Sequence, residues 1–360
     1  MQKKNQKAPS LRGSVTGKAE ASSKRKTRNT TRARRLLRPF GPRNDKVLYI
    51  IILLSLLLPI FDHNAYHIDV LVTAGIFMML ALGLNVIVGS AGILNLGYGA
   101  LFAIGAYTYA LVNIHVHIPF WIGLWISAFS AAFFGMVLAF PALRLSGDYI
   151  AMVTLGTGEI VRIMLNNLDH VTGGPNGLLG IDHPTLWFSN YDFGVHSEPY
   201  YFLVFVLLIL IVFVLKRIES SRLGRAWVAL REDELAASCM GISPVWAKLS
   251  AFGIGGFIAG IAGAVFASKQ GTVSPDSFDF VVSVMVLAMV VLGGLGNIAG
   301  VMIGALALSL LPELLRGFDL YRMLLFGLAM IIIMLFRPQG ILGEIHHREE
   351  FKERESVPSS

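Results

Sequence analysis

Cysteine is almost absent from this chain of 360 residues, in which Cys239 is the single example. A disulfide framework is therefore excluded, and so is a cysteine cluster that could hold zinc or iron and sulfur. Charged residues are also scarce: Asp, Glu, Lys and Arg make up 15% of the chain, whereas 54% is hydrophobic. So much apolar surface excludes an ordinary soluble domain and indicates a membrane protein.

The sequence also lacks the residues of an energy-converting or catalytic site. A phosphate-binding loop needs Gly-x-x-x-x-Gly-Lys followed by Ser or Thr. The nearest run, Gly13 to Ala19, has one residue too few between its glycines and no hydroxyl after the lysine. The histidines lie at the ends of apolar runs, in loops or in the tail, and neither a buried serine with a helical histidine nor a pair of intramembrane aspartates appears. We therefore expect no metal site and no enzyme.

Positive charge is concentrated at the N-terminus. Residues 1–46 hold 15 Lys plus Arg and 2 acids, which gives +13, and the other 314 residues give −6, so that 13 − 6 equals the net charge of +7. We predict a disordered basic arm at 1–46 that stays in the cytoplasm and contacts anionic membrane lipid, with no nucleic acid as a partner. An organellar transit peptide is the alternative. Residues 344–360 are expected to form a charged cytoplasmic tail.

Apolar runs follow the arm, each close to the length that crosses about 30 Å of hydrocarbon as a helix. Ten are recognised, at 47–61, 68–88, 92–112, 119–142, 149–168, 200–216, 249–268, 280–296, 298–315 and 321–336. Glycine or ionisable residues interrupt the third, fifth, eighth and ninth, which are candidates for broken or re-entrant helices. Basic residues gather in alternate loops and acids in the others, which favours cytoplasmic N and C termini. The sequence thus predicts an all-α fold, a polytopic membrane helix bundle of about ten transmembrane segments.

The longest inner loop, residues 217–248, predicts a short amphipathic helix outside the bilayer. It should run from Ala226 to Met240 and end before Gly241 and Pro244. Three successive acids, residues 232–234, disfavour a position on an anionic membrane surface. We therefore expect this helix to dock in a groove of a soluble partner.

At this loop the chain resembles a known family. The run Glu234-Leu-Ala-Ala-Ser-Cys-Met-Gly241 is similar to the coupling motif of ABC-importer permeases, in which an acid and an Ala pair precede a glycine. Further runs, at 83–112, 147–162, 172–178, 290–305 and 337–343, resemble the LivM-type branched-chain amino-acid permeases, and the likeness covers about 45 to 343. The resemblance implies an ABC-importer permease transmembrane domain at 47–343 that translocates Leu, Ile or Val across the bacterial inner membrane.

The same resemblance implies partners and a docking surface. The partners would be a second, LivH-type permease, two cytoplasmic ATPase subunits that bind ATP and magnesium, and a periplasmic amino-acid-binding protein; this chain itself would need no cofactor. Contact with the ATPase falls on Arg231, Glu232, Asp233, Glu234, Ala236, Ala237 and Gly241. A related importer for urea or short amides and an ion-coupled secondary transporter are the alternative functions.

Small residues mark two further kinds of segment. Four-residue spacing places Gly256 with Gly260, and Gly296 with Gly300 and Gly304, on helix faces that could pack closely, although such faces could instead line the path. Near residue 90, glycines crowd together with polar side chains at a depth where irregular backbone must face protein or a wet cavity. We predict a pathway or gate, or else a simple helix break, at Asn85, Gly89, Ser90, Gly92 and Asn95.

Two charges lie within the fifth apolar run. Glu159 and Arg162 are three residues apart, so they can share a helix face and neutralise one another. A charge at membrane depth is costly and is usually retained for a reason. We predict a structural ion pair, with a direct hold on a zwitterionic substrate as the alternative. The loop at 172–177 should form turns and could contact a binding protein.

Overall fold

The computed structural model describes residues 65–143, 145, 149–184, 193–194, 197–314, 327–328 and 331. The predicted arm at 1–46, the first predicted span at 47–61 and the tail at 344–360 lie outside the described residues, as does the tenth span apart from residues 327, 328 and 331.

Long helices form a bundle within the described residues. They are α3 (Ala65–Asn85), α4 (Tyr98–Val116), α5 (Phe120–Ala142), α6 (Tyr149–Asn167), α8 (Ser197–Glu219), α11 (Pro244–Gln270), α12 (Phe280–Gly293) and α13 (Ile298–Leu314). They correspond to the second to ninth predicted spans. Six helical segments in this part of the chain are long and apolar enough to cross a membrane, and neither α6 nor α13 is among them. A polytopic helical membrane protein is confirmed; ten segments and the sides of the termini stay predictions.

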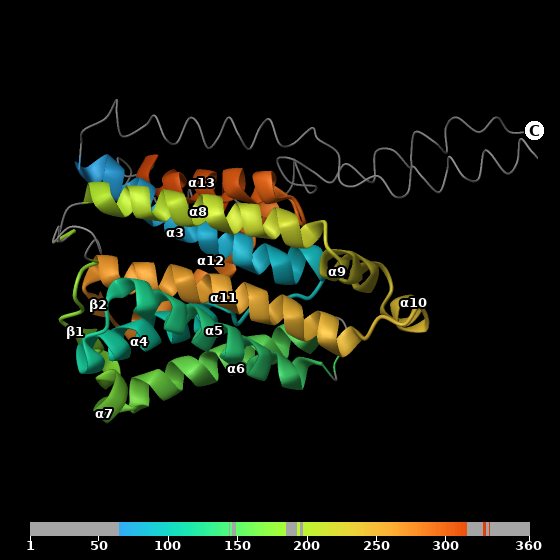
Figure 1. The fold of residues 1–360 in the computed structure, drawn as a ribbon, viewed down its shortest axis with the longest axis horizontal. Helices are drawn as coiled ribbons and strands as arrows, with labels where there is room; N and C mark the ends of the chain where they lie inside the picture. Colours follow the sequence, from blue (N-terminus) through green and yellow to red (C-terminus); the bar gives the residue numbers. More distant parts are fainter. Residues whose placement is uncertain are drawn as a thin grey trace, which may run out of the picture. The chain divides into compact units, whose positions relative to one another are not determined.

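Shorter elements lie at the two ends of the bundle. At one end are α7 (Asp169–Thr172), the 3₁₀ helices η2 (Gly174–Asn176) and η3 (Pro275–Phe278), and the strands β1 (Leu178–Leu179) and β2 (Thr272–Val273). The strands pair antiparallel, with Leu178 opposite Val273. At the other end, α9 (Arg222–Glu232) and α10 (Glu234–Cys239) project beyond the long helices (Figure 1). We call these the sheet end and the α9 end.

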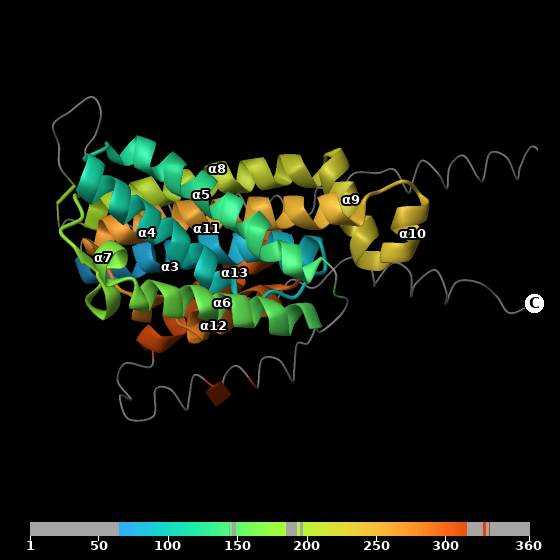
Figure 2. The same ribbon diagram turned by 90° about the horizontal axis from the view of Figure 1, so that it is seen from below.

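Helix α11 is the centre of the bundle and contacts α3, α4 and α5 along its length. Its sequence explains this position, because glycine and alanine occupy most of its buried positions and leave room for close neighbours. Figure 2 shows α6 and α12 along one side of the bundle and α8 along the opposite side. Only Ile150, Ala151 and Thr154 of α6 are buried, so α6 is a peripheral helix.

Candidate functional site

The projecting element consists of two helices rather than one. The single helix expected from Ala226 to Met240 is wrong: α9 begins at Arg222, and Asp233 adopts an extended conformation between α9 and α10. One oxygen of the Asp233 carboxylate accepts hydrogen bonds from the backbone N–H groups of Leu235 (2.8 Å) and Ala236 (3.0 Å). Aspartate is a preferred N-cap, so the acid that the sequence placed inside a helix instead starts a new one.

Both short helices are fixed to the beginning of α11. The buried Trp227 of α9 donates from Nε1 to the carbonyl oxygen of Ala247 and to the hydroxyl of Ser250, each at 3.0 Å. Glu234, at the start of α10, forms an ion pair of 2.8 Å with the Lys248 ammonium, whose side chain is only 6% exposed. These contacts hold α9 and α10 against the first turns of α11.

A third attachment runs from α9 into the bundle. Nη1 of Arg231 donates a hydrogen bond of 2.8 Å to the carbonyl oxygen of Gly89. Gly92 has a φ of +71° and lies against the same side chain, so that a Cβ built on Gly92 would be 2.8 Å from Cγ of Arg231. The coupling residue and the break residues, which the sequence predicted as two separate groups, thus form one contact region.

The break between α3 and α4 is a long interruption of the α-helical backbone. Helix α3 passes into a π-helix, η1 (Val86–Ser90), and α4 starts only at Tyr98, six residues later than expected from the 92–112 run. Side chains supply the missing partners of the backbone N–H groups: Thr154 accepts from Leu96 (3.2 Å), Asn95 from Gly97 (2.9 Å) and Ser283 from Gly99 (2.8 Å). Irregular backbone is tolerated at this depth because it is satisfied by protein.

Asn85 connects the break to the turn between α12 and α13. Its side chain is buried, and Oδ1 accepts a hydrogen bond of 2.9 Å from the backbone N–H of Gly296. Gly296 has a φ of +81° and precedes α13, so the expectation that it shares a helix face with Gly300 and Gly304 is wrong. Gly300 and Gly304 do lie on α13, where both approach the backbone at Gly293 of α12.

The remaining predicted coupling residues differ in exposure. Ala237 is buried, whereas Glu232, Asp233, Glu234, Ala236 and Gly241 are exposed. Large apolar side chains beside them are also exposed, with Leu235 at 76%, Met240 at 83% and Trp246 at 73%. Exposed apolar side chains gathered at a projecting tip indicate a surface that a partner covers.

The predicted glycines of α11 lie at its closest contacts. A Cβ on Gly256 would be 2.5 Å from the carbonyl oxygen of Ala131, and one on Gly260 would be 2.5 Å from that of Ser127, both on α5. A Cβ built on Gly105 of α4 would in turn lie 2.5 Å from Cα of Gly260. These two positions therefore form a packing seam between α11, α5 and α4.

Glu159 and Arg162 form an ion pair on α6, with 2.9 Å between Oε2 and Nε. Their side chains are 32% and 35% exposed, respectively. Glu159 also lines a narrow cavity together with Gly97, Asp279 and Ser283, where the N-terminal ends of α4 and α12 meet α6. The cavity has a volume of about 10 Å³, which holds roughly one water and no amino acid.

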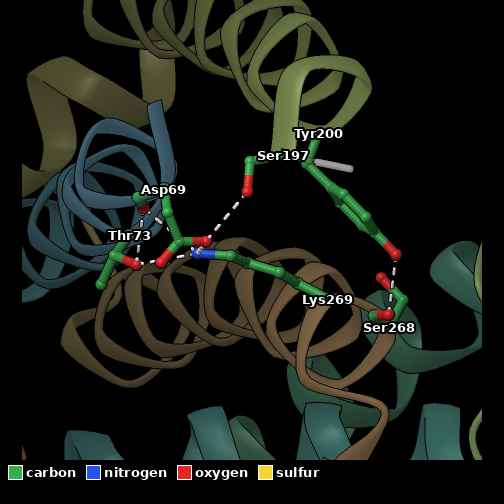
Figure 3. Close-up of polar contacts among 6 residues, drawn as sticks. All are labelled: Asp69, Thr73, Ser197, Tyr200, Ser268 and Lys269. Atoms are coloured by element: carbon green, nitrogen blue, oxygen red, sulfur yellow. Dashed lines mark hydrogen bonds and ion pairs between the residues drawn. The ribbon is translucent and has the colours of Figure 1, made fainter. Parts of the chain in front are cut away.

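Sequence reasoning missed a polar cluster at the sheet end, which Figure 3 shows. Asp69 and Thr73 of α3, Ser197 of α8 and Lys269 of α11 converge there. The Lys269 ammonium lies 2.9 Å from Oδ1 of Asp69 and donates to the Thr73 hydroxyl at 2.9 Å, and Ser197 donates to Asp69 at 3.2 Å. Only the i, i+4 spacing of Asp69 and Thr73 is visible in the sequence; Lys269 is 200 residues away from Asp69 along the chain.

Removing each charge of this cluster should have unequal effects. The Lys269 side chain is 11% exposed and that of Asp69 is 49% exposed. A carboxylate stranded by Lys269→Met can be hydrated, whereas an ammonium stranded by Asp69→Ala remains buried. We expect Lys269→Met to cost about 1 kcal/mol and Asp69→Ala about 3 kcal/mol of stability. Thermal unfolding in detergent measures both, and an equal or reversed order would contradict the assignment.

Comparison with known proteins places these features in a family. The profile described as "Branched-chain amino acid transport system / permease component" matches residues 66–334. The high-affinity branched-chain amino acid transport system permease protein LivM of Escherichia coli K12 is 47% identical over 296 residues, which cover 76% of this chain and 69% of that protein. LivM of Salmonella typhimurium is 46% identical over 296 residues, which again cover 76% of this chain and 69% of that protein.

A second kind of permease is also similar. The high-affinity branched-chain amino acid transport system permease protein LivH of Salmonella typhimurium is 26% identical over 285 residues, 74% of this chain and 91% of that protein. No solved structure matches the chain. The profile match spans most of the bundle, from the first described turn of α3 onward. This chain therefore belongs to the family of branched-chain amino acid transport system permease components.

Proposed function

We propose that this chain is one permease subunit of an ATP-driven importer of Leu, Ile and Val. Its relatives at 47% and 46% identity are permeases of branched-chain amino acid transport systems, which supports this cargo over urea or amides. The chain is a transport component and not an enzyme. Its partners are a LivH-type permease, two cytoplasmic ATPase subunits that bind ATP and magnesium, and a periplasmic amino-acid-binding protein. The assembly resides in the bacterial inner membrane.

The observation that carries this proposal is the construction of the α9–α10 element. Its apolar side chains Leu235 and Met240 project from the bundle without burial, while Trp227 and Arg231 anchor it inward. A helix pair exposed on one side and fixed on the other suits docking in a groove of a soluble subunit. The α9 end then faces the cytoplasm and the sheet end faces the periplasm.

Movement of the ATPase groove would reach the membrane along the three attachments of α9 and α10. Trp227 and Glu234 would pull or push on α11 through their contacts with it, and Arg231 would do the same to the broken segment through its hydrogen bond with the Gly89 carbonyl. Because Asn85 joins this segment to the α12–α13 turn, two irregular pieces of backbone move together. A cargo molecule shifts a conformational equilibrium only by its differential affinity, so the energy for uphill import enters through this element.

Uptake by reconstituted vesicles tests the function. Vesicles that contain this chain, its LivH-type partner and the ATPases, with ATP enclosed and the loaded binding protein outside, are expected to accumulate radiolabelled leucine. Accumulation should require ATP hydrolysis and be indifferent to a proton uncoupler, since the driving force is not an ion gradient. Excess isoleucine or valine should compete, and urea and short amides should not. Uptake driven by an ion gradient through this chain alone would refute the proposal.

A further inference from the structure

We propose that the outer face of α6 is the surface against which the second permease subunit packs. This face comprises Met152, Gly156, Glu159, Ile160 and Ile163. The positions recur at intervals of three and four residues and therefore lie on one side of the helix. The inference rests on the proposed function, because it takes a LivH-type chain as the partner, and it adds where that partner sits.

The charges on this helix are the first argument. Helix α6 is not among the six segments apolar enough to span a membrane by themselves, but its 19 residues, about 28 Å at 1.5 Å per residue, suffice to cross the hydrocarbon core if protein covers its polar face. Glu159 is the eleventh of these residues, near the middle of the helix, and the ion pair that it forms with Arg162 is about one-third exposed. Ionisable side chains in a membrane face protein or water-filled cavities rather than lipid tails. Lipid is therefore the wrong neighbour for this face.

Gly156 is the second argument, and it is independent of charge. Glycine within a helix is less favourable than alanine and is normally retained where another backbone comes close. Gly158, two residues on, has such a reason: its Cβ would be 2.9 Å from Cα of Gly97. Among the residues that the structure describes, no atom of another element lies within 4 Å of a Cβ built on Gly156. A helix of another polypeptide that packs on this face would explain a small residue at this position.

Other exposed faces differ in the way expected for lipid. The exposed middle of α5 presents Trp125, Phe129 and Phe133, and that of α8 presents Val206, Leu210 and Phe213. Neither stretch contains an ionisable side chain between its ends. Helices α6 and α8 lie on opposite sides of the bundle (Figure 2). A lipid-facing side and a protein-facing side are thus distinguished by chemistry.

The second permease is the occupant that fits this side. LivH of Salmonella typhimurium is 26% identical to this chain over 285 residues, so the two kinds of permease share their family. Similar subunits commonly pair through the same surface on each partner, related by a two-fold axis. Such a pair brings α6 and its counterpart together at the level of Glu159, and the narrow cavity beside Glu159 then opens towards the subunit interface.

Site-directed photocrosslinking in the membrane tests this placement. The photoreactive residue p-benzoyl-phenylalanine is placed at Ile160 of the full chain, which is co-expressed with an epitope-tagged LivH-type subunit, the ATPases and the binding protein. Matched controls carry it at Phe133 on α5 and at Val206 on α8. The natural side chains at the three positions are 64%, 59% and 62% exposed, and each lies near the middle of its helix.

We expect an adduct with the tagged permease from Ile160 and none from Phe133 or Val206. Adducts from Phe133 or Val206 alone would overturn the placement, as would reaction at Ile160 only with lipid or with this chain's own residues 321–336. Co-purification of the tagged subunit with the unsubstituted chain is measured in parallel. Its absence would refute the proposed function, whereas its presence with a wrong crosslink pattern refutes only the interface.

A second variant measures pairing directly. Within the described ranges, no element other than α6 comes within 4 Å of the Cβ that Gly156→Leu adds, so the amount of inserted chain should be unchanged. We expect loss of the co-purifying tagged subunit, because the larger side chain blocks close approach of its helix. Val206→Leu is the matched control and should retain the pair. Retention of the pair by Gly156→Leu would contradict the inference.

Discussion

Replacing Arg231 with alanine is expected to lower ATP-driven leucine uptake by about tenfold to a hundredfold. The substitution removes the hydrogen bond to the Gly89 carbonyl, and a hydrogen bond that involves a charged group is worth about 1.5–3 kcal/mol. Each 1.4 kcal/mol corresponds to about a factor of ten. Trp227 and Glu234 still hold α9 and α10 on α11, so ATPase subunits should still bind and hydrolyse ATP. The expected result is hydrolysis without matching transport.

Arg225→Ala is the matched control on the same helix. Nη1 of Arg225 donates to the nearby carbonyl oxygen of Ser220, an exposed local contact that does not reach the bundle. Uptake per ATP hydrolysed in reconstituted vesicles should therefore fall for Arg231→Ala and stay normal for Arg225→Ala. Arg231→Lys keeps a cationic donor and should restore part of the coupling. Equal effects at the two arginines would show that charge on α9, not the contact with Gly89, is responsible.

Gly92→Ala approaches the same contact from the other side. Its Cβ would press on the Arg231 side chain, and its left-handed backbone, with φ at +71°, disfavours any side chain. If both residues act through one contact, the double variant should be no worse than the more severe single one. If the double variant instead loses uptake by the product of the two single-variant factors, Arg231 and Gly92 act independently and not through one contact.

Local signals predicted the helices well because composition and length decide them in a membrane. Runs such as 119–142 and 249–268 contain few polar residues, and the observed α5 and α11 overlap them almost completely. The sequence also showed where regular helix would fail, since glycines crowd around Asn85 and Asn95. Polar side chains that satisfy a broken backbone must be near it, so part of the site is visible as local composition.

Contacts between distant segments could not be predicted in the same way. The hydrogen bond from Arg231 to Gly89 joins residues 142 positions apart, and that from Gly296 to Asn85 joins residues 211 apart. Asp233 misled for a different reason, because an acid inside an apparent amphipathic helix looks like a solvent-exposed position. Its N-cap role depends on the extended conformation that the structure reveals. The sequence therefore predicted which residues belong to the site, but not the hydrogen bonds that join them.

Gly260→Ala is expected to destabilise the bundle, because the added methyl group has no space. The Cβ would lie 2.5 Å from the Ser127 carbonyl oxygen and 2.7 Å from Cα of Ala128, both backbone atoms of α5. Overpacking of this kind costs about 1–3 kcal/mol, which exceeds the helix-propensity gain of about 0.8–1 kcal/mol for replacing glycine by alanine. A lower midpoint of thermal unfolding in detergent, and less folded protein in the membrane, should follow.

Gly253→Ala on the same helix separates lost packing from altered helix propensity. Its Cβ would lie 3.4 Å from Cγ of Met136, an ordinary contact with a flexible side chain, so the propensity gain is not offset. We expect its unfolding midpoint to equal or slightly exceed that of the original chain, while the midpoint of Gly260→Ala falls. If Gly260→Ala were as stable as Gly253→Ala, the contact of α11 with α5 and α4 would accommodate an added methyl group without lowering the unfolding midpoint. The four-residue glycine spacing would then reflect a path rather than a packing seam.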